Sequence, residues 1–224
     1  MEIREITYAA IAIRICVAVI LGGILGLERG LKNRPAGLRT YMLVCTGSCL
    51  IMMTNQYIYQ AFGAGDPVRM GAQVVSGIGF LGAGTIVVTK RNQIKGLTTA
   101  AGLWAAAAAG LAIGIGFYEA AIMGGSAIFV VLSVIQRWDN RMHQNSKVVE
   151  LYVELTDAIN LGQFMRQIKA MGLEIENIQT EHDGTTEGNV RSYIVVLNAR
   201  QKRNHEALFQ DIRNLEGVFY LEGL

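Results

Sequence analysis

Residues 77–84, GIGFLGAG, carry the glycine spacing of a loop that binds a dinucleotide. In such a loop the backbone approaches a pyrophosphate, and an acidic residue about 20 positions later holds the ribose. Here no Asp or Glu occurs between Asp66 and Glu119, and the glycines lie in the middle of an apolar run. We therefore predict helix packing, because small residues let membrane helices approach closely. The packing positions are Gly77, Gly79, Gly82 and Gly84. Glycines four positions apart, a spacing that places them on one helical face, also occur at Gly22 and Gly26, and at Gly110 and Gly114.

Polar side chains inside apolar runs indicate a second kind of chemistry, because a charge in lipid is costly and is often functional. Arg69, Gln73 and Ser76 recur at i, i+4 and i+7, the spacing of one helical face. Arg14 lies at a similar depth, so we predict a buried polar network or ion path in which Asp66 lies between Arg14 and Arg69. The alternative is that Asp66 caps the helix that follows it, while Arg14 extends toward the interface.

Another polar group is expected where a basic loop joins the first two apolar runs. Glu28 ends the first run and Arg39 begins the second, so we predict an ion pair between them, with Thr40, Thr98 and Thr99 at the same level. The alternative is that Glu28 and Arg29 are solvated. Asp66 is the one acidic residue that we place at membrane depth. The sequence therefore predicts no resident cofactor and leaves magnesium as the metal to consider.

The elements that position these residues are expected to be membrane helices. Apolar residues make up 51% of the 224 positions and charged residues only 17%, whereas an ordinary soluble domain carries roughly 25% charged residues. Five runs approach the ~20 residues that a helix needs to cross the hydrocarbon layer. They are residues 7–27, 40–60, 70–89, 97–116 and 117–136. The basic connections after the first, third and last runs then place the N-terminus outside and the C-terminal part in the cytoplasm.

The last third of the chain has the composition of a small soluble domain. Residues 1–147 contain 13 basic and 6 acidic residues, whereas residues 148–224 contain 7 and 12, and this acidic balance argues against nucleic-acid binding. Its periodicity predicts the order βαββαβ of a ferredoxin-like fold. We expect a transmembrane domain over 1–137, a juxtamembrane linker over 138–147 and a cytoplasmic α+β domain over 148–224.

Several segments resemble the MgtC/SapB family of bacterial inner-membrane proteins. They are GLERG, RPAGLRTYMLV, DPVRMGAQVVSGIGFLGAGTI and KGLTTAAGLWAAAAAGLAIGIGFY, within about residues 20–120. The resemblance implies a multi-pass protein of the inner membrane with five spans and an ACT-like cytoplasmic domain. The family motif also departs at Tyr41, where histidine is common. The motif positions that carry over are Glu28, Arg29, Arg39, Thr40, Asp66, Arg69, Gln73, Gly77, Gly79, Gly82, Gly84 and Asn92.

The resemblance also implies a role in growth under low magnesium, with links to virulence in some pathogens. One member of the family is reported to restrain the F-type ATP synthase. We therefore expect a regulatory protein that contacts the lipid bilayer and other membrane complexes such as the ATP synthase, and that could form a homo-oligomer. The alternative is a cation (magnesium) transporter or channel that uses the polar face of the third span. An enzyme is not expected, because the three histidines lie outside the spans and no catalytic motif occurs.

Overall fold

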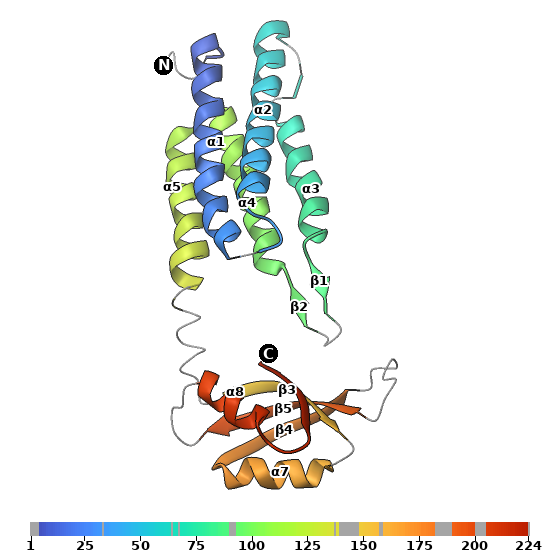
Figure 1. The fold of residues 1–224 in the computed structure, drawn as a ribbon. Coiled ribbons are helices and arrows are strands. Elements are labelled where there is room, and N and C mark those ends of the chain that lie inside the picture. The colour runs from blue at the N-terminus through green and yellow to red at the C-terminus, as the bar shows by residue number, and fades with distance from the viewer. Residues whose placement is uncertain are drawn as a thin grey trace. The chain divides into compact units, whose positions relative to one another are not determined.

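The computed structural model describes residues 5–32, 34–63, 65–66, 68–89, 93–136, 138, 148–156, 159–181, 190–199 and 205–223. The chain divides into two compact units, Met1–Arg137 and Trp138–Leu224, which are helical and α/β respectively (Figure 1). Each unit has its own core and is described by itself. Of the predicted linker over 138–147, only Trp138 belongs to the described residues.

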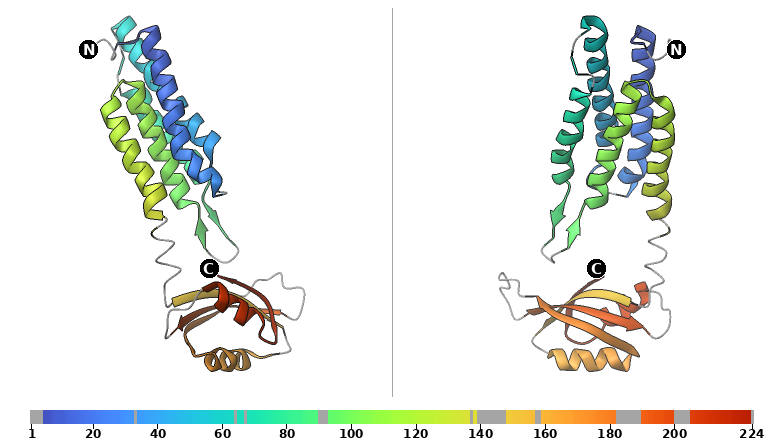
Figure 2. Two further views of the ribbon diagram at one scale, coloured as in Figure 1. Left: turned by 60° about the vertical axis from the view of Figure 1, so that its left-hand side comes forward. Right: turned by 180° about the vertical axis from the view of Figure 1, so that it is seen from behind.

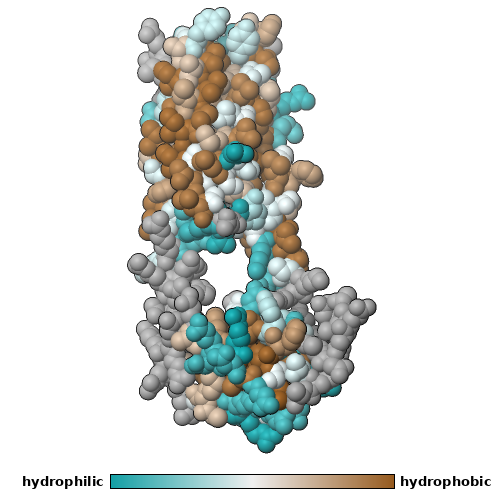
Figure 3. All heavy atoms as spheres, in the orientation of Figure 1, coloured by the Kyte–Doolittle hydropathy of each residue, from teal (hydrophilic) through white to brown (hydrophobic). Residues whose placement is uncertain are grey.

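The helical unit contains helices that run side by side in both views of Figure 2. In chain order its elements are α1 (Tyr8–Leu31), α2 (Leu38–Phe62), α3 (Arg69–Ala83), β1 (Val87–Val88), β2 (Ile94–Lys95), α4 (Leu97–Gly114), α5 (Tyr118–Phe129) and the π-helical segment η2 (Val130–Ile135). Within the described residues, three helices are long and apolar enough to cross a membrane, namely α1, α4 and the continuous Tyr118–Ile135. Figure 3 shows apolar side chains covering much of this unit on the face in view.

The third apolar run differs from the prediction of a helix over 70–89. Helix α3 ends at Ala83, and the run continues as β1, which pairs antiparallel with β2. The Thr85 hydroxyl donates to the Gly82 carbonyl at 2.8 Å, and the β-branched residues that follow favour an extended backbone. Gly96 directly precedes α4 at φ 100°, and a Cβ there would collide with the Thr85 carbonyl oxygen. The hairpin therefore needs glycine at this position.

Helix α2 is packed between α1 and α4 through glycines of both neighbours. A Cβ at Gly22 of α1 would lie 2.7 Å from the Tyr41 carbonyl oxygen, and one at Gly114 of α4 would lie 2.5 Å from that of Cys49. Gly26 and Gly110 approach α2 in the same way. The small-residue spacing in the first and fourth runs therefore allows the close backbone contacts expected of membrane helices.

The α/β unit has the element order predicted for it. Its elements are β3 (Val148–Thr156), α7 (Leu161–Ala170), β4 (Leu173–Glu181), β5 (Val190–Ala199), α8 (His205–Arg213) and β6 (Val218–Gly223). All strand pairs are antiparallel, and the sheet order is β4-β5-β3-β6. A capping box of Asn160 and Gln163 begins α7, and Gly172 at φ 77° follows its end.

The core of the α/β unit lies between one face of the sheet and the two helices. Alternate residues of β3 and β5, such as Leu151 and Val195, pack against Phe164 of α7 and Ile212 of α8. In β3 this period of two is also visible in the sequence and predicted the strand.

Candidate functional site

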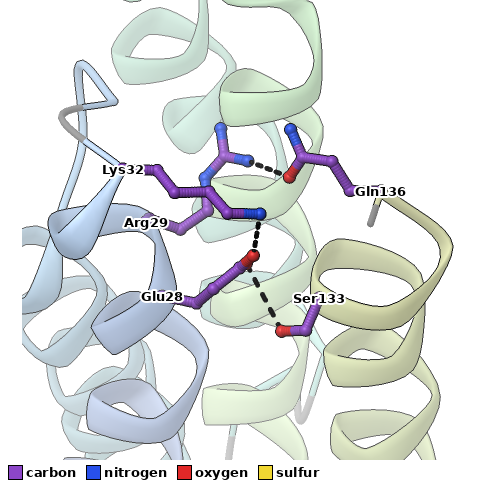
Figure 4. Close-up of polar contacts among 5 residues, drawn as sticks. All are labelled: Glu28, Arg29, Lys32, Ser133 and Gln136. Atoms are coloured by element: carbon purple, nitrogen blue, oxygen red, sulfur yellow. Dashed lines mark hydrogen bonds and ion pairs between the residues drawn. The ribbon is translucent and has the colours of Figure 1, made fainter. Parts of the chain in front are cut away.

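A buried polar cluster lies near the end of α1, and we call it the Glu28 cluster. It contains Glu28, Arg29, Lys32, Thr99, Ser133 and Gln136, five of which are drawn in Figure 4. The Glu28 carboxylate forms an ion pair with Lys32, one turn further along α1, and accepts a hydrogen bond from the Ser133 hydroxyl at 3.3 Å. Glu28 as a whole residue is 9% exposed, and Ser133 is 4% exposed. The contact therefore ties α1 to η2 through a buried charge.

Arg29 extends the Glu28 cluster to α4. This side chain is 1% exposed, and its Nη2 donates to Oγ1 of Thr99 at 2.5 Å. Its Nη1 lies 3.5 Å from the Gln136 side-chain oxygen. With the Gln136 amide turned over, its oxygen accepts from Nη2 of Arg34 at 2.9 Å and its nitrogen donates to the Leu132 carbonyl at 3.0 Å. In both orientations Gln136 faces a guanidinium group.

The predicted ion pair between Glu28 and Arg39 does not form. Helix α1 continues to Leu31, so Glu28 faces the bundle, and Lys32 reaches it across a single turn of the same helix. Arg39 and Thr40 are exposed at the start of α2. Asn92 lies outside the described residues.

A second buried arginine lies toward the other end of α1. Arg14 is 0% exposed, and its Nη1 donates to Oε1 of Gln56 on α2 and to the Gly114 carbonyl at the end of α4, both at 2.7 Å. A guanidinium group in an apolar bundle is stabilised when such acceptors surround it. Arg14 therefore joins three helices at this level.

The predicted network of Arg14, Asp66 and Arg69 is not assembled in the described residues. Asp66 is exposed, and its Oδ1 accepts the backbone N–H of Val68 at 2.9 Å, while its carbonyl accepts that of Arg69 at 3.3 Å. The carboxylate therefore organises the turn that begins α3, which is the alternative that the sequence left open. Arg69, Gln73 and Ser76 are all exposed on α3.

An open groove of about 700 Å³ lies between α2 and α3, and we call it the α2–α3 groove. Its polar residues are Ser48, Arg69 and Gln73, and the other lining residues are apolar or glycine. They are Leu43, Val44, Gly47, Ile51, Met70, Val74, Gly77, Ile78 and Leu81. The groove therefore brings two of the predicted polar residues, but not Asp66, to one cavity.

The glycines of α3 pack differently from the prediction. A Cβ at Gly77 or Gly79 would meet no atom within 4 Å, so neither glycine allows a close approach inside the chain. Gly82 does face α4, since a Cβ there would lie 3.4 Å from the Cβ of Ala100. A Cβ at Gly84 would approach only carbonyl oxygens at the end of its own helix. The packed face of α3 passes through Gly71, Ile78 and Gly82, the residues of this helix that are buried, and leaves Gly77 to the groove.

Three polar residues of these clusters were not predicted from the sequence. Gln56, Ser133 and Gln136 are uncharged, and each accompanies a charge that lies far away in sequence. The signal that could have identified them is their place in the sequence, because each polar residue lies within or at the end of an apolar run. Among the described residues, no group of three or more His, Cys, Asp or Glu side chains could hold a metal ion.

Comparison with known proteins decides the family. The model of the MgtC family matches residues 15–141, which is more than half of the chain. The chain belongs to the MgtC family. It is 29% identical to "Protein SapB" of Bacillus subtilis over 93% of this chain and 92% of that protein. It is 36% identical to "Putative magnesium transporter YhiD" of Escherichia coli K12, with coverage of 78% and 83%, and 40% identical to "Protein MgtC" of Brucella abortus, with coverage of 53% and 48%.

Membership of the MgtC family and the three long apolar helices together identify a membrane protein. The Glu28 cluster lies inside the matched region, whereas Arg14 directly precedes it. The similarity to SapB extends into the α/β unit as well, because it covers 93% of the chain.

Proposed function

We propose that this MgtC-family protein serves magnesium homeostasis, in adaptation to low magnesium, as a regulator that contacts other membrane complexes. The F-type ATP synthase is the partner that we would test first. The proposal places the protein in the bacterial inner membrane with five spans, the N-terminus outside and the α/β unit in the cytoplasm. The name of one relative, "Putative magnesium transporter YhiD", supports the link to magnesium.

The observation that carries the regulatory role is where the charges of the helical unit lie. Glu28, Arg29 and Arg14 are buried in contacts that join helices to one another, and none of the three lines the α2–α3 groove. The α2–α3 groove instead opens to the surface between two helices and is mostly apolar. Such a distribution suits a rigid bundle that binds at its lipid-facing surface more than one that conducts ions.

The α/β unit supports a second part of the same proposal. Its two helices cover one face of the sheet, and the other face carries Tyr152 and Tyr220, whose rings lie 6.3 Å apart. We propose that this ACT-like domain binds a small ligand or a second copy and passes that signal to the membrane part. The fold alone does not name the ligand.

A genetic and biochemical experiment tests the regulatory proposal. A strain that lacks the protein should grow more slowly than a complemented strain when magnesium is scarce, and its inverted membranes should show changed ATP synthase activity. Affinity purification of the full chain in mild detergent should recover a membrane complex. Unchanged ATP synthase activity together with the recovery of no partner would contradict the proposal.

A second candidate function is cation transport along α3. Arg69 and Gln73 line the α2–α3 groove, and one relative is named as a magnesium transporter. If the protein transports magnesium, the purified full chain in liposomes should release or admit the ion, and Gln73→Leu in the groove should reduce the flux. Absence of flux in liposomes of confirmed integrity would exclude this candidate.

A further inference from the structure

We infer that the α2–α3 groove is a binding site for one anionic phospholipid. The phosphate would lie against Arg69 and Gln73, and an acyl chain would lie along the apolar part of the groove. The depth of Arg69, the direction of the groove, the charge of its lining and the space that its glycines leave support this assignment.

Arg69 begins α3 at about the level where α4 ends, while α1 and α2 extend further in the same direction. Gly71, two residues further along α3, faces both Met52 of α2 and Leu111 of α4, and α4 ends three residues later at Gly114. The level of Gly114 is also that of the Arg14 guanidinium. Exposed aromatic residues at this level and on the part of α2 beyond it mark the interface between lipid and water. They include Tyr57, Tyr59, Phe62 and Phe117.

The groove runs from this interface into the apolar layer. Its lining on α3 extends from Arg69 to Leu81, a rise of about 18 Å at 1.5 Å per residue. That length is comparable to one leaflet, since the whole hydrocarbon core is about 30 Å thick. Gly82, beyond the far end, packs on Ala100 of α4, so α3 and α4 remain in contact along this length.

The charge of the lining suits a phosphate. Arg69 and Gln73 lie one turn apart at the interfacial end, and the twelve lining residues include no carboxylate. Arginine and amide side chains donate hydrogen bonds to phosphate oxygens, and a guanidinium adds charge to the contact. Deeper in the groove the polar lining is limited to the hydroxyl of Ser48, which is 4% exposed. A cationic end and an apolar remainder match the two parts of a phospholipid.

The groove is wide because two glycines face it. Gly47 of α2 and Gly77 of α3 line the groove, and a Cβ at either position would meet no atom within 4 Å. Side chains there would occupy the space without disturbing the bundle. The volume of about 700 Å³ is in the range of small-molecule sites, roughly 300–1,000 Å³.

Lipid binding by the purified full chain in detergent tests the inference. We would titrate phosphatidylglycerol and phosphatidylcholine of identical acyl chains and count bound lipids by native mass spectrometry. The expected result is one phosphatidylglycerol per chain, bound about tenfold more tightly than phosphatidylcholine, which corresponds to about 1.4 kcal/mol. Arg69→Gln should remove this preference, and Gly77→Leu should abolish binding of either lipid at the site.

Matched variants control for charge and bulk. Arg39→Gln removes an exposed arginine that does not line the groove, and Gly124→Leu adds the same side chain at an exposed glycine of α5 with no atom within 4 Å. Both should bind phosphatidylglycerol as the unmodified chain does. Equal binding of the two lipids, or full binding by Gly77→Leu, would overturn the inference. A third result would also overturn the inference, namely that Gly77→Leu converts a dimer into a monomer and leaves lipid binding unchanged. That result would show that a second copy of the chain, not a lipid, occupies the groove.

Discussion

The buried arginines show how single residues hold the helical unit together. Arg14 and Arg29 lie 15 positions apart on α1, or about 22 Å along its axis. Each donates to groups on other helices, Arg14 to α2 and α4, and Arg29 to α4. A charged donor loses its hydration on burial, so the acceptors that replace water determine whether the arrangement is stable.

Thr99→Val tests one of these acceptors. The substitution keeps the shape of the side chain but removes the oxygen that accepts from Arg29. Loss of a hydrogen bond to a buried charged group should lower the free energy of unfolding by about 1–3 kcal/mol. Unfolding of the purified chain by SDS in mixed micelles measures the change.

Thr98→Val is the matched control, because Thr98 is the adjacent residue and is exposed. Its unfolding free energy should remain within about 0.5 kcal/mol of the unmodified chain. Equal effects of the two substitutions would show that the Thr99 hydroxyl contributes nothing specific.

At the scale of elements, the α/β unit was the part most completely predicted. The alternation in β3, the apolar run of β5 and the helix stop at Gly172 are local signals that the packing of this unit leaves unchanged. The third apolar run was predicted less well. Hydropathy distinguishes apolar from polar residues but not helix from strand, so the change from α3 to β1 was missed.

The contacts between helices were predicted least well, for a physical reason. The pair of Glu28 and Arg39 looked favourable because both flank one loop, but the length of α1 turns Glu28 toward Lys32 and Ser133. Likewise, glycine spacing predicts that close packing occurs but not against which helix. Gly77 faces the α2–α3 groove, whereas Gly110 lies against Cys45.

Gly110→Ala tests the contact of α2 with α4. The added Cβ would collide with the backbone carbonyl of Cys45, and backbone cannot rotate away as a flexible side chain can. We expect the two helices to separate and the free energy of unfolding in mixed micelles to fall by about 1–3 kcal/mol, the cost of overpacking.

Gly124→Ala provides the comparison for Gly110→Ala on α5. A Cβ at Gly124 meets no atom within 4 Å, and alanine favours the helix over glycine by about 1 kcal/mol. This variant should therefore be as stable as the unmodified chain or more stable. A destabilised Gly124→Ala, or an unaffected Gly110→Ala, would contradict the glycine contact.

At the scale of the whole molecule, the chain consists of two units with separate cores. Phe164 and Ile168 of α7 and Leu208 and Ile212 of α8 all pack on the sheet of their own unit. The burial of apolar surface that stabilises the α/β unit is therefore supplied within residues 148–224. We expect a fragment of these residues to be soluble and to unfold cooperatively.

Phe164→Ala and Phe219→Ala measure that core. Phe164 is 0% exposed, so its truncation should destabilise the fragment by about 3–5 kcal/mol. Phe219 is 68% exposed, and its truncation should cost less than about 1 kcal/mol. Urea denaturation followed by circular dichroism gives both values. A fragment without a cooperative transition would mean that the α/β unit needs the rest of the chain to fold.

The threading of the helical unit can be determined with reporters inserted at three positions. Helix α3 has 15 residues and is about 22 Å long, which is shorter than the roughly 30 Å of hydrocarbon. A third span over this part of the chain therefore needs the β1–β2 hairpin in addition to α3. With five spans, a reporter at Gly65 lies outside, whereas reporters at Lys95 and after Leu224 lie in the cytoplasm. Alkaline phosphatase should then be active only at Gly65, and green fluorescent protein should fluoresce only at the other two. If α3 failed to cross, Lys95 and Leu224 would both report the same side as Gly65, because one fewer crossing inverts everything that follows.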